Sequence, residues 1–190
     1  PAAFFQHFPP EYRTGQAAVD KHLEFFRATG MDFVKVQYEK QFPVLPSIQK
    51  PADWANMPRY DLDFYEAPLA VIRGLVQAAK ADALVIVTLY SPFMQAKYTV
   101  GNDLLMAHLN EAPDAVARGL AIITESMLDF VRACIVIGVD GFYHSTQGGE
   151  AGRYQDATTF TRCIKPYDLA LAEAAAQGCI FNILHVCDYQ

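Results

Sequence analysis

"ALVIVTLY", residues 83–90, is the stretch of sequence that decides the fold. It is rich in Val and Ile and too short for a lone core helix, so it predicts a strand buried on both faces, as in a parallel sheet. Residues 63–80 before it and 113–137 after it have helical periodicity, with Pro113 at the start of the second helix. A buried strand between two helices is typical of an α/β protein.

The same alternation continues along the rest of the chain. The spacing predicts further strands over 32–38, 139–146 and 180–187, and further helices over 17–29, 102–110, 156–164 and 166–177, with a loop at 91–93. Well-separated strands need crossover connections, so we expect them to be parallel and to neighbour one another in chain order. Two architectures fit, an open doubly wound sheet and a (β/α)8 TIM barrel, of which four strands are about half.

Composition narrows the class of protein. The chain has 190 residues, of which 52% are hydrophobic and 19% charged, enough for one domain over residues 1–190 with a sizeable core. The net charge of −6 and the absence of a basic run argue against nucleic-acid and membrane-surface binding. No apolar run approaches the ~18–20 residues of a membrane helix, and no glycine-rich phosphate motif follows a strand. Four cysteines without scaffold spacing indicate free thiols in a cytoplasmic protein.

Active sites of parallel α/β proteins lie at the carboxyl ends of the strands, and residues two apart on a strand share a face. His185 and Cys187 therefore share a face at the end of the last strand. On the third strand, the sequence leaves open whether the His144/Thr146 face or the Tyr143/Ser145 face joins them. The other sets of residues that share a face at a strand end are Lys35, Gln37 and Glu39 on the first strand, and Thr88 and Tyr90 on the second.

A histidine and a cysteine on one strand face have two interpretations. Each alone is more often a core residue than a ligand, but the two together at a strand end make a metal site as plausible as a structural role. We expect the other histidines to be structural, and the other cysteines to lie in the core; these are His7, His22, His108, Cys134, Cys163 and Cys179.

Four segments carry a resemblance to known proteins: HFPPEYR (7–13), LYSPFMQAKYTVG (89–101), the block 109–150 that contains GVDGFYHSTQGGE, and KPYDLALAEAAAQGCIFNILHVCD (165–188). In this order they resemble the uroporphyrinogen decarboxylase superfamily, and within it the branch of methylcobalamin:thiol methyltransferases. The resemblance implies a distorted (β/α)8 barrel, of which this chain supplies about the first half, with the C-terminal half absent.

The same resemblance implies a site. His185 and Cys187 match the H-x-C zinc ligands of the methyltransferases, with a third cysteine expected beyond Gln190. Asp188 stands where that family has Gly, and its nearness in sequence allows it either to hydrogen-bond to His185 or to lie at the rim of the site. Bound Zn²⁺ would activate a thiol substrate that accepts a methyl group from a corrinoid, supplied by a corrinoid protein. The residues expected to be catalytic are His185, Cys187, Tyr90, His144 and Ser145, and those expected to bind the cofactor are Gln37, Tyr143 and Gln147.

Two alternatives remain open. One is uroporphyrinogen III decarboxylase, a cofactor-free carboxyl-lyase of porphyrin and haem biosynthesis, although His7 stands where that enzyme has an arginine. The other is a non-catalytic partner of a corrinoid protein. Whichever function holds, half a barrel leaves open sheet edges. We therefore expect the 190-residue segment alone to aggregate, and we allow for a homodimer.

Overall fold

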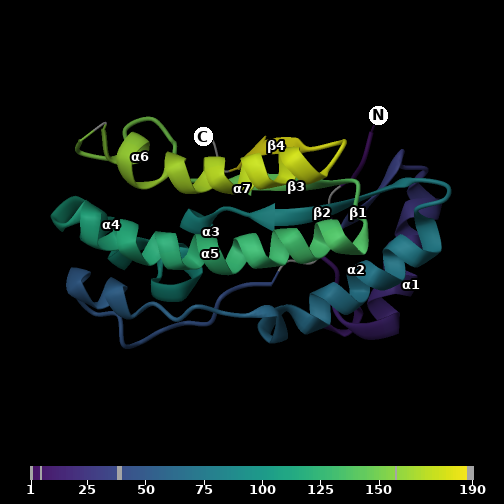
Figure 1. Cartoon of the computed structure of the whole chain (residues 1–190), viewed down its shortest axis with the longest axis horizontal. Coiled ribbons are helices and arrows are strands. Elements are labelled where there is room, and N and C mark those ends of the chain that lie inside the picture. The colour runs from purple at the N-terminus through teal and green to yellow at the C-terminus, as the bar shows by residue number, and fades with distance from the viewer. Residues whose placement is uncertain (1, 5, 38–39, 157, 188–190) are drawn as a thin grey trace.

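The architecture is an α/β layer built on one parallel sheet (Figure 1). A computed structural model describes residues 2–4, 6–37, 40–156 and 158–187. The four strands are β1 (Phe33–Val36), β2 (Leu84–Tyr90), β3 (Gly141–Thr146) and β4 (Ile183–Val186). They pair in the order β1-β2-β3-β4 and every pair is parallel, which confirms the strand order expected from the sequence.

Seven α-helices and three 3-10 turns connect the strands within the described ranges. The helices are α1 (Gly15–Thr29), α2 (Glu66–Ala79), α3 (Pro92–Val100), α4 (Asn102–Glu111), α5 (Pro113–Ile137), α6 (Thr158–Cys163) and α7 (Lys165–Gly178), and the turns are η1 (Pro10–Tyr12), η2 (Pro51–Asn56) and η3 (Leu62–Tyr65). Gly30 and Gly138 end α1 and α5 in left-handed conformations, with φ of 63° and 101°. None of the helices in the described ranges is long and apolar enough to cross a membrane.

The helix α3 was not expected from the sequence, which predicted a loop at residues 91–93. Ser91 caps this helix, since its hydroxyl accepts a hydrogen bond from the backbone N–H of Met94 at 3.2 Å. Pro92 follows at the first helical position, where the missing N–H costs nothing. Ser-Pro therefore starts a helix here directly after β2, and the expectation of a loop was wrong.

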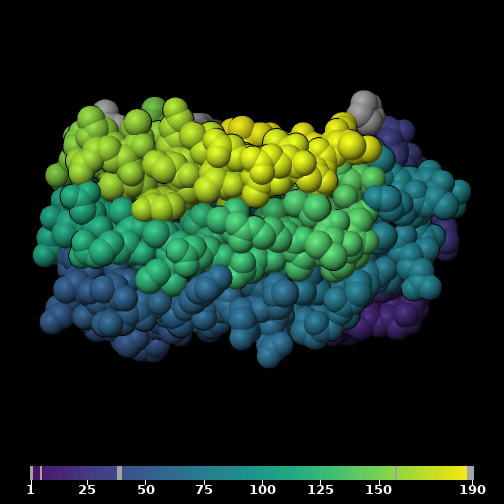
Figure 2. Space-filling model, in the orientation of Figure 1, coloured from purple at the N-terminus to yellow at the C-terminus, as the bar shows by residue number. Residues whose placement is uncertain are grey.

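The two faces of the sheet differ in chemistry. The face that we call the apolar face packs against α2, α5 and α7, and its buried side chains include Val34, Val85, Val87, Leu89 and Phe142. In Figures 1 and 2, α5 lies between α7 and the N-terminal half of the chain. The opposite face, which we call the polar face, carries alternate residues of the same strands: Lys35, Gln37, Ile86, Thr88, Tyr90, Tyr143, Ser145, Ile183, His185 and Cys187.

The amino ends of the strands are fixed by one buried carboxylate. Asp140 accepts a hydrogen bond from the backbone N–H of Val85 at 2.9 Å, and pairs with the Lys80 ammonium at 3.1 Å. On the apolar face, β4 leaves Leu184 66% and Val186 44% exposed.

Candidate functional site

The carboxyl ends of three strands bring hydroxyl and imidazole groups into one row. The register pairs Tyr90 on β2 with Ser145 on β3, and Ser145 with His185 on β4. Residues in register on parallel strands point to the same side of a sheet, so all three belong to the polar face. The structure therefore brings together three of the side chains that the sequence singled out.

The register also decides which face of β3 joins the site. Tyr143 and Ser145 lie on the polar face, and the imidazole ring of His185 stacks on the ring of Tyr143, with centroids 5.1 Å apart and planes 28° apart. Burial raises the pKa of the Tyr143 hydroxyl, and the nearby Cys187 sulfur adds to this shift. Tyr143 is therefore a direct neighbour of the His185 and Cys187 pair.

His144 points the other way, contrary to the sequence expectation that placed it among the catalytic residues. It lies on the apolar face, is 6% exposed, and its Nε2 has no hydrogen-bond partner among the residues that the structure describes. Burial lowers its pKa to about 4. It lines a separate groove of about 240 Å³ with Asp168 and Leu184, so we leave His144 out of the proposed site.

Gln147, expected to bind a cofactor, lies in the same separate groove. Its side chain is buried and its Oε1 accepts a hydrogen bond from the Lys97 ammonium. The alternation along β3 ends at Thr146, so spacing alone could not place Gln147. We leave it out of the proposed site as well.

His185 and Cys187 are half-buried at the end of β4. The backbone N–H of Cys187 donates to the carbonyl oxygen of Thr146 at 2.9 Å, so strand pairing continues as far as Cys187. Imidazole nitrogen and thiolate sulfur are donors that zinc prefers. Within the described residues, no group of three or more His, Cys, Asp or Glu side chains is placed to hold a metal ion, and Asp188 lies outside the described residues. By donor type the pair is suited to zinc, for which it would supply two ligands.

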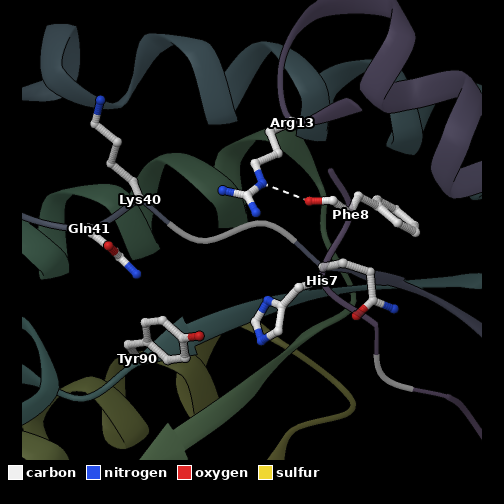
Figure 3. A pocket seen from close by; sticks show the side chains of 7 residues that line it. His7, Phe8, Arg13, Lys40, Gln41 and Tyr90 are labelled. Atoms are coloured by element: carbon white, nitrogen blue, oxygen red, sulfur yellow. Dashed lines mark hydrogen bonds between the residues drawn. The ribbon is translucent and has the colours of Figure 1, made fainter. Parts of the chain in front are cut away.

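A cavity of about 290 Å³ opens beside this row, over the carboxyl ends of β1 and β2. Its lining is polar and cationic: His7, Phe8, Arg13, Gln37, Lys40, Gln41 and Tyr90. Figure 3 shows the Tyr90 hydroxyl and the His7 ring pointing toward one another, with the Arg13 guanidinium above them. Tyr90 therefore belongs both to this cavity and to the row that ends in His185.

Sequence reasoning missed His7 and Arg13 as site residues. His7 lies in an irregular segment with no periodic signal, and the sequence predicted a structural role for it. Its pKa is lowered, first by burial and then by the positive charges of Lys35 and Arg13. Arg13 is held in place by its Nε, which donates to the Phe8 carbonyl oxygen at 2.8 Å. Together they make this part of the cavity suited to an anionic group.

Gln37 ties the N-terminal segment to the sheet. Its side-chain amide donates to the Phe4 carbonyl oxygen at 3.1 Å and accepts from the backbone N–H of Gln6 at 3.2 Å. Its own backbone N–H donates to Nε2 of His22 at 2.8 Å. The sequence predicted a cofactor-binding role for Gln37, which lines the cavity; these contacts also use its amide to position the cavity wall.

Residues 23–190 match the family model described as uroporphyrinogen decarboxylase (URO-D). Among solved structures, a methyltransferase from Methanosarcina mazei superposes with a TM-score of 0.70 at 16% sequence identity, a likeness of fold. The match covers 94% of this chain and 58% of that one, so the chain spans somewhat more than half of that structure's length. No curated protein matches the chain.

Proposed function

The chain belongs to the uroporphyrinogen decarboxylase family and forms part of that family's (β/α)8 barrel, and on this premise we propose that it is part of a zinc-dependent methyltransferase. The proposed reaction moves a methyl group from a corrinoid to a small thiol. The observation that carries this proposal is the pairing of His185 and Cys187 on the polar face, beside Tyr143, where the strands end. The methyltransferase from Methanosarcina mazei, which has the same fold, agrees with this branch of the family.

His185 and Cys187 would hold the metal, and a third ligand is not among the described residues. Zinc, when bound, would lower the pKa of a coordinated thiol substrate, so that its proton passes to solvent and the thiolate is left as the nucleophile. The half-buried position of both residues leaves one side open for a substrate to approach. Tyr143 restricts the rotation of the His185 ring by stacking on it.

The remaining residues of the polar face would bind and orient the substrate. Tyr90 directs its hydroxyl into the cavity, and Ser145 lies in register between Tyr90 and His185. Arg13 and His7 offer N–H donors to an acidic group at the far end of the cavity. A small thiol that carries a carboxylate, sulfonate or phosphate would place its acidic group against this cationic wall.

The same cationic wall favours a second candidate function. A porphyrinogen carries several carboxylates, and Arg13, His7 and Lys40 line the cavity that would receive one of them. In that case the enzyme would be a decarboxylase without a metal. The Lys40 ammonium lies over the Phe64 ring, 4.4 Å from its centroid, and in Figure 3 it points away from Tyr90. The wall therefore presents Arg13 and His7 most directly to a ligand.

Two assays on the full-length protein separate the candidates. One follows methyl transfer from methylcobalamin to a panel of small acidic thiols, and the other follows decarboxylation of uroporphyrinogen III. We expect methyl transfer, reduced at least about 100-fold in Cys187→Ala, because even residues that only orient a metal ligand contribute 10–100-fold. Cys179→Ala is the matched control, since Cys179 lies at the amino end of the sheet, with its sulfur 3.9 Å from the Val139 carbonyl oxygen.

The opposite pattern would replace the proposal with the second candidate. Decarboxylation that survives Cys187→Ala unchanged, without methyl transfer to any thiol of the panel, is the result that favours a decarboxylase. Arg13→Gln should lower the apparent affinity for the acidic substrate in either case, and so tests the cationic wall independently of the reaction type.

A further inference from the structure

A buried lysine stands on the polar face at a position that the proposed reaction does not use. Lys35 on β1 is 3% exposed. Its ammonium donates to the Thr88 hydroxyl oxygen at 2.9 Å and lies 3.5 Å from the side-chain oxygen of Gln37. Burying a charge costs free energy unless it is well compensated, so contacts such as these are needed to keep the ammonium buried.

The Thr88 hydroxyl fixes where the ammonium lies. This hydroxyl donates its own proton to the Val36 carbonyl oxygen at 2.5 Å, so its lone pairs are left to accept from Lys35. The contact is therefore a charge-assisted hydrogen bond with one defined direction. Lys35 is held over the sheet toward β3 rather than left to sample several rotamers.

The ammonium contacts the next ring along the face. Its nitrogen lies over the Tyr143 ring, 4.3 Å from the centroid, a distance at which the ring quadrupole attracts a cation. The His185 ring stacks on the same Tyr143 ring. The neighbours of β3 are β2 and β4, and β1 lies beyond β2. Tyr143 is therefore contacted from one side of its strand by the lysine, which reaches across β2, and from the other side by the histidine.

We propose that Lys35 is a positioning residue that orients His185 through the ring of Tyr143. The ammonium holds the tyrosine ring, and the tyrosine ring in turn holds the imidazole plane, which sets the direction in which the His185 nitrogens point relative to Cys187. The part of this inference that concerns a metal rests on the proposed function, whereas the orientation of the His185 ring does not.

The test measures metal affinity in the full-length protein. Zinc and Co²⁺ affinities are obtained by competition titration for wild type, Lys35→Met, Tyr143→Leu and the double variant. Lys35→Met should weaken binding about tenfold, at the lower end of what residues around a ligand contribute. The effect of Lys35→Met should disappear in the Tyr143→Leu background, because the route through the ring is then already lost.

Three further variants control for folding and for charge. Lys35→Arg keeps the cation and should restore affinity to within about twofold of wild type. Tyr143→Phe keeps the ring and should preserve the effect of Lys35→Met. Lys80→Met removes a lysine that pairs with Asp140 at the amino end of the sheet, so it should lower stability in urea unfolding without changing metal affinity.

The outcomes separate this inference from the proposed function. Two results overturn the positioning role while zinc binding stands. One is unchanged metal affinity in Lys35→Met, and the other is an equal loss of affinity on Lys35→Met in wild type and in Tyr143→Leu. If wild type binds no metal, the proposed function fails, and the His185 ring resonances in the NMR spectrum of the metal-free protein decide the inference. A shift in Lys35→Met that is absent when Tyr143 is already Leu supports it, and unchanged resonances refute it.

Discussion

His22 should make the stability of the protein depend on pH in a way that can be isolated. This imidazole is 2% exposed, and its Nδ1 donates to the Ala18 carbonyl oxygen at 2.7 Å while its Nε2 accepts from the backbone N–H of Gln37 at 2.8 Å. Only the neutral ring can accept at Nε2, so protonation breaks the contact that holds the end of β1. Burial first, and the charge of Lys35 after it, lower the pKa from 6.5 to about 4, although the Ala18 contact acts in the opposite direction.

The sign and size of the effect follow from these two pKa values. Between pH 6.5 and pH 4 the unfolded chain binds a proton at His22 that the folded chain does not bind, so the free energy of unfolding falls as the pH falls. With one pKa unit equal to about 1.4 kcal/mol, the loss between pH 7 and pH 5 is about 2 kcal/mol. His144 adds a loss of similar sign, and Asp168, whose pKa burial raises to about 6, opposes it.

A variant at His22 separates its share from the others. In His22→Leu the backbone N–H of Gln37 is left without its acceptor, which should cost about 1–3 kcal/mol at pH 7. The difference in the free energy of unfolding between wild type and His22→Leu should shrink by about 2 kcal/mol at pH 5, because only wild type still titrates there. Urea unfolding followed by circular dichroism at both pH values measures this, and His144 and Asp168 cancel in the difference.

His22→Gln controls for the change in polarity. It carries an amide but does not titrate, so its difference from wild type should shrink by the same amount. Parallel stability curves for wild type and both variants from pH 7 to pH 5 would refute the reasoning, since they would mean that His22 does not act as a neutral acceptor.

Three further predictions concern the core, the cavity and the exposed part of the apolar face. Gly119→Ala on α5 should lower the free energy of unfolding by about 1–3 kcal/mol in urea titrations, because the added methyl group would overlap the buried Trp54 indole; unchanged stability would mean that the indole can move. Arg13→Gln should weaken binding of an acidic ligand about tenfold and reduce its salt dependence in calorimetry, and equal affinity would place the ligand elsewhere. The 190-residue segment alone should self-associate in sedimentation experiments through exposed Leu184, and Leu184→Glu should reduce this; a monodisperse wild-type monomer would contradict the expectation.

The sheet could be predicted from the sequence because its strands are short, apolar and separated by clear helices. The run 83–90 and the glycines at 30 and 138 are local signals, and the structure places β2, α1 and α5 accordingly. The helix α3 was missed because Ser91 and Pro92 are equally typical of a turn. A cap can be told from a turn only by the N–H that it binds, here that of Met94.

The site was only partly predictable for a different physical reason. Both faces of β3 are buried, so hydrophobic patterning could not decide between His144 and Tyr143. Pairing with β4 decides it, and pairing is a property of the assembled sheet. His7 enters the cavity because Gln37 binds the backbone of the N-terminal segment, a contact between residues 31 positions apart that no local pattern reveals.

The zinc content of the full-length protein tests the central claim most directly. Elemental analysis of the protein purified without chelators should find about one zinc per chain, because a catalytic zinc site holds one ion. Cys187→Ala and His185→Ala should each lose the metal, whereas Cys179→Ala, which changes a cysteine at the amino end of the sheet, should keep it. Protein that holds no zinc yet turns over its substrate, or zinc that remains in both ligand variants, would contradict the account.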